Sequence, residues 1–298
     1  MSNFFTPKKC ELCNSISIKY RDYYEELLSN KLNSIIKKSI FKVLNRDTEN
    51  IGLKTYNMYV GHFLVKCLDC GFASIQPPLR EYDLLNFFNS IYTQSKGTVL
   101  KPGINSLRAV SQYDYLIRNV PVKGINSLLE FGAAGAAIGR RIASKNNMDS
   151  MSVVEPGLNW HRLYEKYSEV HITPYSSLFD VPLKAKYDLF LSSHGLQYVS
   201  NFDNYFSRAV RLVKKGGFLF FEVPNRDDNW FKMKLNCGGH TVFFSEKSIE
   251  NIAKKYSLRL INSATFGAIY GAKEIKLREN KFTEQIGGRY LRFILEKP

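Results

Sequence analysis

The chain has 298 residues, of which 44% are hydrophobic and 23% are charged, a composition that excludes a disordered or fibrous protein. Its 42 Lys and Arg residues against 27 Asp and Glu leave a net charge of +15, which favours nucleic acid, acidic glycans or anionic membrane surfaces as partners and is equally explained by solubility. The basic residues are scattered along the chain, so we do not expect a dedicated nucleic-acid-binding tail.

No apolar run approaches the ~20 residues that cross a bilayer. The N-terminal segment, residues 1–10, lacks the apolar core of a signal peptide. We therefore expect a cytoplasmic protein without a transmembrane segment. Disulfide bonds are disfavoured in that compartment, so cysteines that occur in pairs there more often bind metal.

The first motif along the chain is a pair of Cys-x-x-Cys sequences, formed by Cys10, Cys13, Cys67 and Cys70. The two-residue spacing lets each turn present both sulfurs to one tetrahedral Zn²⁺. Asn14 and Gly71 follow the second cysteine of each pair, and both residue types tolerate the positive φ of a backbone that curls around a metal. The sequence therefore predicts a structural zinc site with these four ligands.

The region around the cysteines predicts a small N-terminal domain over residues 1–96. Apolar residues recur at helical spacing between the two cysteine pairs, and a Pro-Pro break follows the second pair. The predicted elements are a helical insertion over 20–44, a strand over 49–66, an amphipathic helix over 81–92 and a linker over 93–103.

The rest of the chain, residues 104–298, alternates helical segments with short apolar strands, which is typical of a parallel sheet with crossover helices. We predict strands over 127–131, 150–154, 169–172, 187–192, 217–223, 259–266 and 270–277. We predict helices over 105–120, 136–145, 158–167, 202–213 and 246–256. The fold class is therefore α/β, with a Rossmann-like seven-stranded sheet beside the smaller zinc-knuckle and helical domain. Ligands of such sheets bind beyond the carboxyl ends of the strands.

Residues 127–139 hold the first strand of this sheet, a turn of small residues and the start of a helix. A buried strand, a tight turn and a helix N-terminus in this order allow a ligand to approach the backbone. Glu155 closes the next strand, and an acid about 20 residues beyond such a turn suits the hydroxyl groups of ribose. The pattern predicts a nucleoside-type cofactor without identifying it.

Residues 105–277 resemble the class I S-adenosylmethionine-dependent methyltransferases. The resemblance depends on the turn at 129–135, on Glu155, on Ser177-Leu178, and on the segments 187–199 and 212–224. It implies that S-adenosylmethionine is bound by Glu130, Gly132, Ala134, Gly135, Glu155, Ser177, Leu178 and Ser193.

The first motif departs from that family's acid-x-Gly-x-Gly-x-Gly pattern, because Ala134 and Ala136 stand at two of the glycine positions. Alanine adds a methyl group where the methionine part of the cofactor approaches, and it disfavours positive φ. This departure motivates one alternative: a catalytically silent, cofactor-binding partner in a glycan-assembly complex.

The whole chain resembles bacterial sugar and glycan methyltransferases that carry an N-terminal zinc-binding domain. Residues 238–248 support this likeness, which implies that His240 faces the acceptor. A hydroxyl acceptor must lose a proton during methyl transfer, and the pKa of histidine suits a general base. His240 is the first candidate for that base and His194, which directly follows the fourth predicted strand, is the second. Each histidine is also explained by a purely structural contact.

These observations predict a methyltransferase that O-methylates a sugar or a surface-polysaccharide intermediate. A nucleotide-linked or phosphorylated saccharide would suit the basic charge. An RNA methyltransferase is a further alternative, against which stands the lack of a clustered basic strip interleaved with aromatic residues. The acceptor atom and the oligomeric state stay open.

Overall fold

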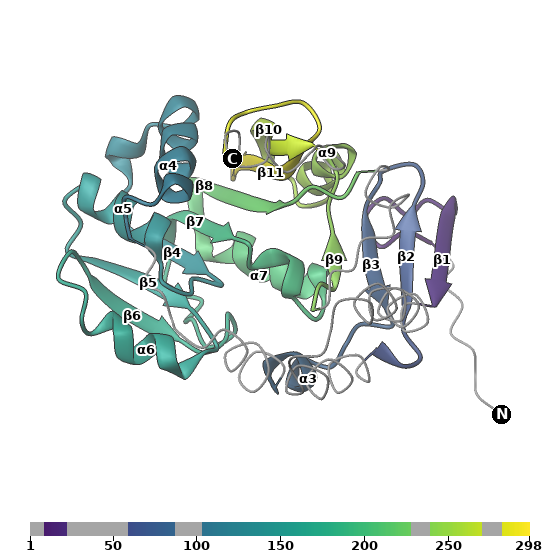
Figure 1. The fold of residues 1–298 in the computed structure, drawn as a ribbon, viewed down its shortest axis with the longest axis horizontal. Coiled ribbons are helices and arrows are strands. Elements are labelled where there is room, and N and C mark those ends of the chain that lie inside the picture. Colours follow the sequence, from purple (N-terminus) through teal and green to yellow (C-terminus); the bar gives the residue numbers. More distant parts are fainter. Residues whose placement is uncertain (1–8, 23–58, 87–102, 228–238, 270–281) are drawn as a thin grey trace, which may run out of the picture.

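The computed structural model describes residues 9–22, 59–86, 103–227, 239–269 and 282–298. Within these residues a seven-stranded sheet lies beside a smaller four-stranded sheet (Figure 1). The large sheet has the order β10-β11-β8-β7-β4-β5-β6. The predicted α/β class with a seven-stranded sheet and a smaller N-terminal unit is therefore confirmed.

The strands of the large sheet are β4 (Leu128–Phe131), β5 (Ser150–Val154), β6 (His171–Tyr175), β7 (Tyr187–Ser193), β8 (Val213–Pro224), β10 (Arg259–Ile269) and β11 (Gly288–Glu296). Five neighbouring strands of the sheet run parallel, namely β8, β7, β4, β5 and β6. β11 pairs antiparallel with both β8 and β10. β4 has β5 on one side and β7 on the other, so the chain order reverses there. Such a switch point opens a crevice at the carboxyl ends of the strands.

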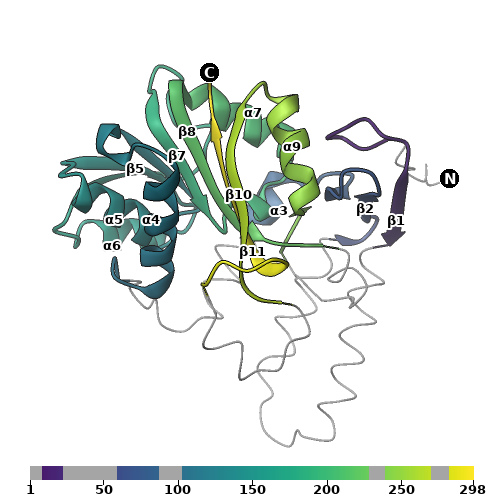
Figure 2. The same cartoon turned by 90° about the horizontal axis from the view of Figure 1, so that it is seen from above.

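Helices cover both faces of this sheet (Figure 2). They are α4 (Leu107–Asn119), α5 (Ala137–Lys145), α6 (Leu158–Tyr164), α7 (Phe202–Leu212) and α9 (Glu246–Lys255). Buried residues of α4, α5 and α6 form one hydrophobic cluster, and those of α7 and α9 belong to another. Leu128 and Leu129 enter different clusters, because successive residues of a strand point to opposite faces.

The small sheet is antiparallel and joins distant parts of the chain. Its strands are β1 (Ile18–Asp22), β2 (Phe63–Cys67), β3 (Ala73–Gln76) and β9 (Val242–Phe243), in that order. β9 follows β8 in the sequence, yet it pairs with β3 of the N-terminal unit, with Ala73 opposite Phe243. Phe72 also packs against Phe202 of α7, with ring centroids 5.2 Å apart. The cysteine-bearing unit and the large sheet therefore share one hydrophobic cluster.

Most predicted elements of the large sheet agree with the structure within a few residues, and β5 has the predicted bounds. The helical insertion over 20–44, the strand over 270–277 and the linker over 93–103 lie almost entirely outside the described residues. The seventh strand of the sheet is β11, which the sequence reasoning did not predict. The domain boundaries stay predictions. No helix within the described part of the chain has the length and apolar character needed to span a membrane.

Candidate functional site

A cavity of about 290 Å³ lies beyond the carboxyl ends of β4 to β7. Helix α3 (Glu81–Asn86) of the N-terminal unit forms part of its wall. Seven residues singled out from the sequence line it: Gly132, Ala134, Glu155, Ser177, Leu178, Ser193 and His194. Residues predicted to act on one ligand, but distant in sequence, therefore meet at one cavity.

The turn after β4 is tight because two loops meet there. Gly132 has a φ of +66°, and a Cβ atom on it would lie 2.7 Å from Cα of Gly195 in the loop after β7. Ala134 and Ala136 also have positive φ values, +44° and +50°. Both alanines therefore adopt the left-handed conformation that alanine disfavours. The turn keeps the backbone of a glycine motif, at a strain of about 1–2 kcal/mol for each alanine.

Glu155 connects this turn to the next loop. Its Oε2 atom accepts a hydrogen bond from the amide N of Ala134 at 2.7 Å, and its Oε1 atom accepts one from Gly157 N at 2.8 Å. Burial raises the pKa of Glu155, although the two backbone donors oppose the rise. Each carboxylate oxygen has a second lone pair. Glu155 can therefore accept further hydrogen bonds from the hydroxyl groups of a ribose at the cavity wall.

Two residues predicted to bind the cofactor, Glu130 and Gly135, are not among those that line the cavity. The carboxyl group of Glu130 is buried behind the turn and accepts a hydrogen bond from Gly139 N at 2.9 Å. Burial raises the pKa of Glu130 to about 8. A Cβ atom on Gly139 would lie 2.4 Å from Oε2 of Glu130, so this acid and the start of α5 are packed closely.

His194, at the end of β7, has its side chain fixed by neighbours on both ring nitrogens. Its Nε2 atom lies 3.2 Å from Oε1 of Glu222. The amide Nε2 of Gln197 donates to the carbonyl O of His194 at 2.9 Å and lies 3.4 Å from Nδ1. Because the amide nitrogen of Gln197 faces a carbonyl, it is the donor toward Nδ1 as well. This contact favours the tautomer of neutral His194 that carries its proton on Nε2, the nitrogen 3.2 Å from Glu222.

Burial, together with two nearby cations, favours the neutral form of His194. Burial lowers its pKa, and the cations of Arg108 and Arg226 lower it further, against the opposing effect of Glu222. Neutral histidine can accept a proton, which is what a general base requires.

Glu222 of β8 is fully buried in a charged network that the sequence did not reveal. Arg292 of β11 donates from Nε to Oε2 of Glu222 at 2.6 Å, and Nε of Arg108 lies 3.3 Å from Oε1. Burial alone would raise the pKa of Glu222, but the contact with His194 and the charges of Arg292 and Arg108 hold it well below its ordinary value. Glu222 is therefore an anion behind the imidazole of His194.

His240, the first candidate base from the sequence, does not line the cavity. Its side chain is buried, and its ring lies edge-on to the ring of Tyr198 with centroids 4.8 Å apart. Tyr198 itself lines the cavity. Burial lowers the pKa of His240 far below its ordinary value, with smaller contributions from Arg226 and His194. His240 thus lies behind the cavity wall, with Tyr198 in front of it.

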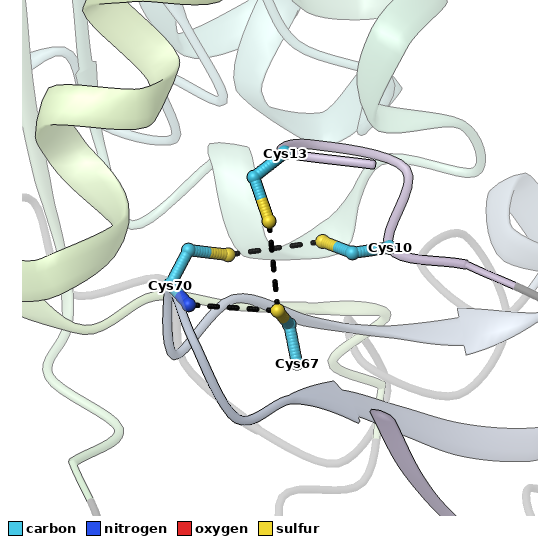
Figure 3. A group of neighbouring side chains, drawn as sticks. All are labelled: Cys10, Cys13, Cys67 and Cys70. Carbon is cyan, nitrogen blue, oxygen red and sulfur yellow. Dashed lines mark hydrogen bonds between the residues drawn. The ribbon is translucent and has the colours of Figure 1, made fainter. Parts of the chain in front are cut away.

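The four paired cysteines meet at one point (Figure 3). The Sγ atoms of Cys10 and Cys70 are 3.7 Å apart, those of Cys13 and Cys67 are 3.6 Å apart, and all four lie within 4.8 Å of one another. Tetrahedral zinc with bonds of ~2.3 Å places its sulfur ligands about 3.8 Å apart. The cluster therefore has the composition and spacing that suit Zn²⁺.

The two cysteine turns repeat one backbone pattern. Asn14 N donates to the carbonyl O of Cys10 at 3.0 Å, and Gly71 N donates to that of Cys67 at 3.1 Å. Asn14 and Gly71 have φ values of 60° and 70°. The positive φ predicted after each cysteine pair is confirmed. Both turns therefore curl their backbone around the four sulfurs.

Comparisons with known proteins agree with this geometry. A family model described as a methyltransferase domain matches residues 108–263. No curated protein matches the sequence.

Among solved structures, the chain is similar to an S-adenosylmethionine-dependent methyltransferase of Thermotoga maritima, named a possible histamine N-methyltransferase. The identity is 15% and the TM-score 0.52, over 72% of this chain and 100% of the other. It is also similar to a chain from the Haloferax volcanii complex between the Trm112 methyltransferase activator and a methyltransferase candidate. That match has 12% identity and a TM-score of 0.50, over 64% of this chain and 91% of the other. At such low sequence identities these similarities establish the fold alone.

Proposed function

We propose that this chain, which belongs to the methyltransferase-domain family and is an S-adenosylmethionine-dependent enzyme, methylates a hydroxyl group of a sugar or of a surface-polysaccharide intermediate. S-adenosylmethionine supplies an electrophilic methyl group, so the protein must align the acceptor with it and remove the acceptor's proton.

The cavity residues carry the cofactor part of the proposal. Glu155 would bind the ribose hydroxyl groups, and the backbone of the turn at Gly132 and Ala134 would lie against the cofactor. Ser177 and Leu178 would face its adenine, while Ser193 would lie toward its methionine part. Glu130, buried behind the turn, would support the turn from within instead of touching the cofactor.

The observation that carries the choice of a hydroxyl acceptor is the neutral imidazole of His194 on the cavity wall, backed by the anionic Glu222. In the proposed step, Nδ1 takes the acceptor proton, replacing its long 3.4 Å contact with Gln197. The imidazolium that forms is then stabilised by Glu222, as a carboxylate stabilises histidine in hydrolase triads. His240 would shape the wall through Tyr198 instead of acting as the base.

The acceptor class is inferred from charge. Arg108 lines the cavity, as His194 does, and the chain carries a net charge of +15. The phosphate groups of a nucleotide-linked or phosphorylated saccharide could bind this arginine, next to the general base His194. The four cysteines would hold a structural Zn²⁺ in the N-terminal unit, where their spacing suits tetrahedral thiolate ligation.

Methyl transfer to a defined set of acceptors tests this function. The enzyme is incubated with methyl-labelled S-adenosylmethionine and, separately, with nucleotide-linked sugars, phosphorylated sugars and total RNA. We expect label in a saccharide as an alkali-stable methyl ether. Label in RNA alone would establish the RNA-methyltransferase alternative. Cofactor binding by calorimetry without transfer to either class would support the silent-partner alternative, and lack of S-adenosylhomocysteine binding would overturn all three.

A further inference from the structure

One end of the cavity is formed by the N-terminal unit. Glu81, Leu84 and Leu85 of α3 line it, next to the loop that follows β6. In Figure 1 this short helix lies below the carboxyl ends of the strands, on the side that faces α7. The N-terminal unit therefore supplies wall residues as well as the cysteine cluster.

Glu81 is held in place from the methyltransferase side. The hydroxyl group of Tyr205 in α7 donates to Oε1 of Glu81 at 2.6 Å, and Oγ of Ser177 lies 3.5 Å from the same oxygen. No described residue donates a hydrogen bond to Oε2. One carboxylate oxygen is thus anchored, and the other is left to accept a hydrogen bond from a ligand.

The rest of the cavity determines which part of a nucleoside would meet Glu81. If Glu155 binds ribose at the end of β5, the two substituents of the ribose extend in opposite directions. The reactive one lies toward His194 after β7, so the base lies toward Ser177 and Leu178 after β6. Neither of these two residues carries an acid, and Glu81 is the carboxylate that lines this end.

We propose that Glu81 accepts, through Oε2, a hydrogen bond from the exocyclic amino group of the cofactor's adenine and selects adenine over 6-oxo bases. Adenine presents a hydrogen-bond donor at this position, whereas hypoxanthine presents an oxygen. An oxygen facing a carboxylate lacks a proton between the two acceptors and is repelled. The inference rests on the proposed function, since it presumes an adenosine-type cofactor in this cavity. It gives a residue of the N-terminal unit a role in cofactor choice.

Calorimetric titration with S-adenosylhomocysteine and S-inosylhomocysteine tests the proposal, with binding as the readout. Wild-type protein should prefer the adenine ligand by about tenfold or more, the usual effect of one hydrogen bond to a charged group. Glu81→Ala should bind S-adenosylhomocysteine about tenfold more weakly and lose most of this preference. Glu81→Gln, which keeps an acceptor oxygen, should recover part of the preference. Asp83→Ala is the matched control, because Asp83 lies on the same helix but pairs with Arg80 at 2.7 Å outside the cavity.

The outcomes separate this inference from the proposed function. If wild-type protein binds neither ligand, the function itself fails. If it binds S-adenosylhomocysteine and Glu81→Ala keeps both its affinity and its preference, the role of Glu81 is overturned while the function stands. Equal losses in Glu81→Ala and Asp83→Ala would indicate damage to α3 and would also overturn it. Loss confined to the Glu81 variants, with partial recovery in Glu81→Gln, supports it.

Discussion

His194 and Glu222 are paired through both backbone and side chain. The backbone N of His194 donates to the carbonyl O of Glu222 at 2.8 Å, while Nε2 of the imidazole lies 3.2 Å from Oε1 of the carboxylate. His194 directly follows β7 and Glu222 lies on the neighbouring parallel strand β8, where Ser193 is opposite Glu222 in the register. A histidine fixed at two points beside a buried anion is oriented before any ligand arrives, which is a condition for efficient proton transfer.

Replacing His194 should remove the proton acceptor. We expect His194→Gln to lower the rate of methyl transfer by ~100-fold or more, the usual contribution of a general base. The affinity for S-adenosylhomocysteine, measured by calorimetry, should change far less. His240→Asn is the comparison, because His240 lies behind Tyr198, and it should keep most of the turnover. The opposite result, in which only the His240 variant loses turnover, would restore His240 as the base.

The acid side of the pH–rate profile should report His194. Because burial and the charges of Arg108 and Arg226 lower its pKa, the neutral base persists to a pH below its ordinary value of 6.5. Activity should therefore fall only below that pH. Removing one cation should raise this pKa, so the acid limb of kcat/KM in Arg108→Gln should move to higher pH.

Arg118→Gln provides the control for that shift. Arg118 lies on the same helix, α4, but pairs with Glu284 in solvent, where its side chain is 61% exposed. Its removal should leave the acid limb where it is. An unshifted limb in Arg108→Gln would show that the titrating group is not the histidine beside Arg108.

Metal loss should destabilise the protein if the four cysteines hold zinc. We expect one equivalent of zinc per chain in the purified protein and less in Cys67→Ser, together with a free energy of unfolding lower by about 3 kcal/mol. The effect should extend to the large sheet, because Cys67 and Cys70 pack in the same hydrophobic cluster as Phe202 and Phe244.

Cys237→Ser is the matched control for metal content. Cys237 is the fifth cysteine, belongs to no Cys-x-x-Cys pair and lies outside the described residues. Its replacement should leave the zinc content unchanged. Equal metal loss in both variants, or wild-type protein without zinc, would contradict the assignment.

The sequence predicted those features of the site that neighbouring residues encode. The small residues after β4, the acid after β5 and the cysteine spacing are local patterns, and each lies at the cavity or the cluster that the pattern indicated. Glu81, Arg108 and Arg292 were not predicted, because no local pattern distinguishes them from solvated charges.

Tertiary pairing gives these three residues their environments. Arg292 lies opposite Glu222 only because β11 pairs antiparallel with β8. Its charge also interrupts the apolar face of β11, which weakened the sequence signal for that strand. β9 has two residues, too few for periodicity to register, yet it connects the small sheet to the rest of the chain.

The positive φ values of the turn predict an unusual response to glycine. Ala134→Gly should relieve about 1–2 kcal/mol of strain and cost about 0.4–1 kcal/mol through the more flexible unfolded chain, a net gain in stability. Ala136→Gly should gain less, because Ala136 is fully buried and loses its methyl contact, worth about 0.8 kcal/mol.

Urea denaturation measures both changes. Ala143→Gly, in α5, is the control and should lower the free energy of unfolding by about 2 kcal/mol, because glycine costs about 1 kcal/mol in a helix and the fully buried methyl group of Ala143 is worth about 0.8 kcal/mol. Destabilisation by Ala134→Gly as large as that of Ala143→Gly would refute the strain at this turn.

The fully buried pair of Glu222 and Arg292 should respond asymmetrically to substitution. Glu222→Gln leaves the guanidinium group of Arg292 buried without its anion, which should cost about 3–5 kcal/mol at pH 7. Adding Arg292→Met to this variant removes the unpaired charge and should recover part of the loss, a coupling that a double-mutant cycle measures.

The dependence on pH gives this prediction a second readout. The pKa of Glu222 is held below its ordinary value of 4.5, so the folded state favours the anion. Its contribution to stability is therefore complete above pH 4.5 and is lost as the pH falls below that value. Urea denaturation at pH 7 and pH 4 should show a smaller difference for Glu222→Gln than for the wild-type protein. If the double variant is no more stable than Glu222→Gln, and the difference between the two pH values is unchanged, the buried pair does not stabilise the β8–β11 contact through its charges.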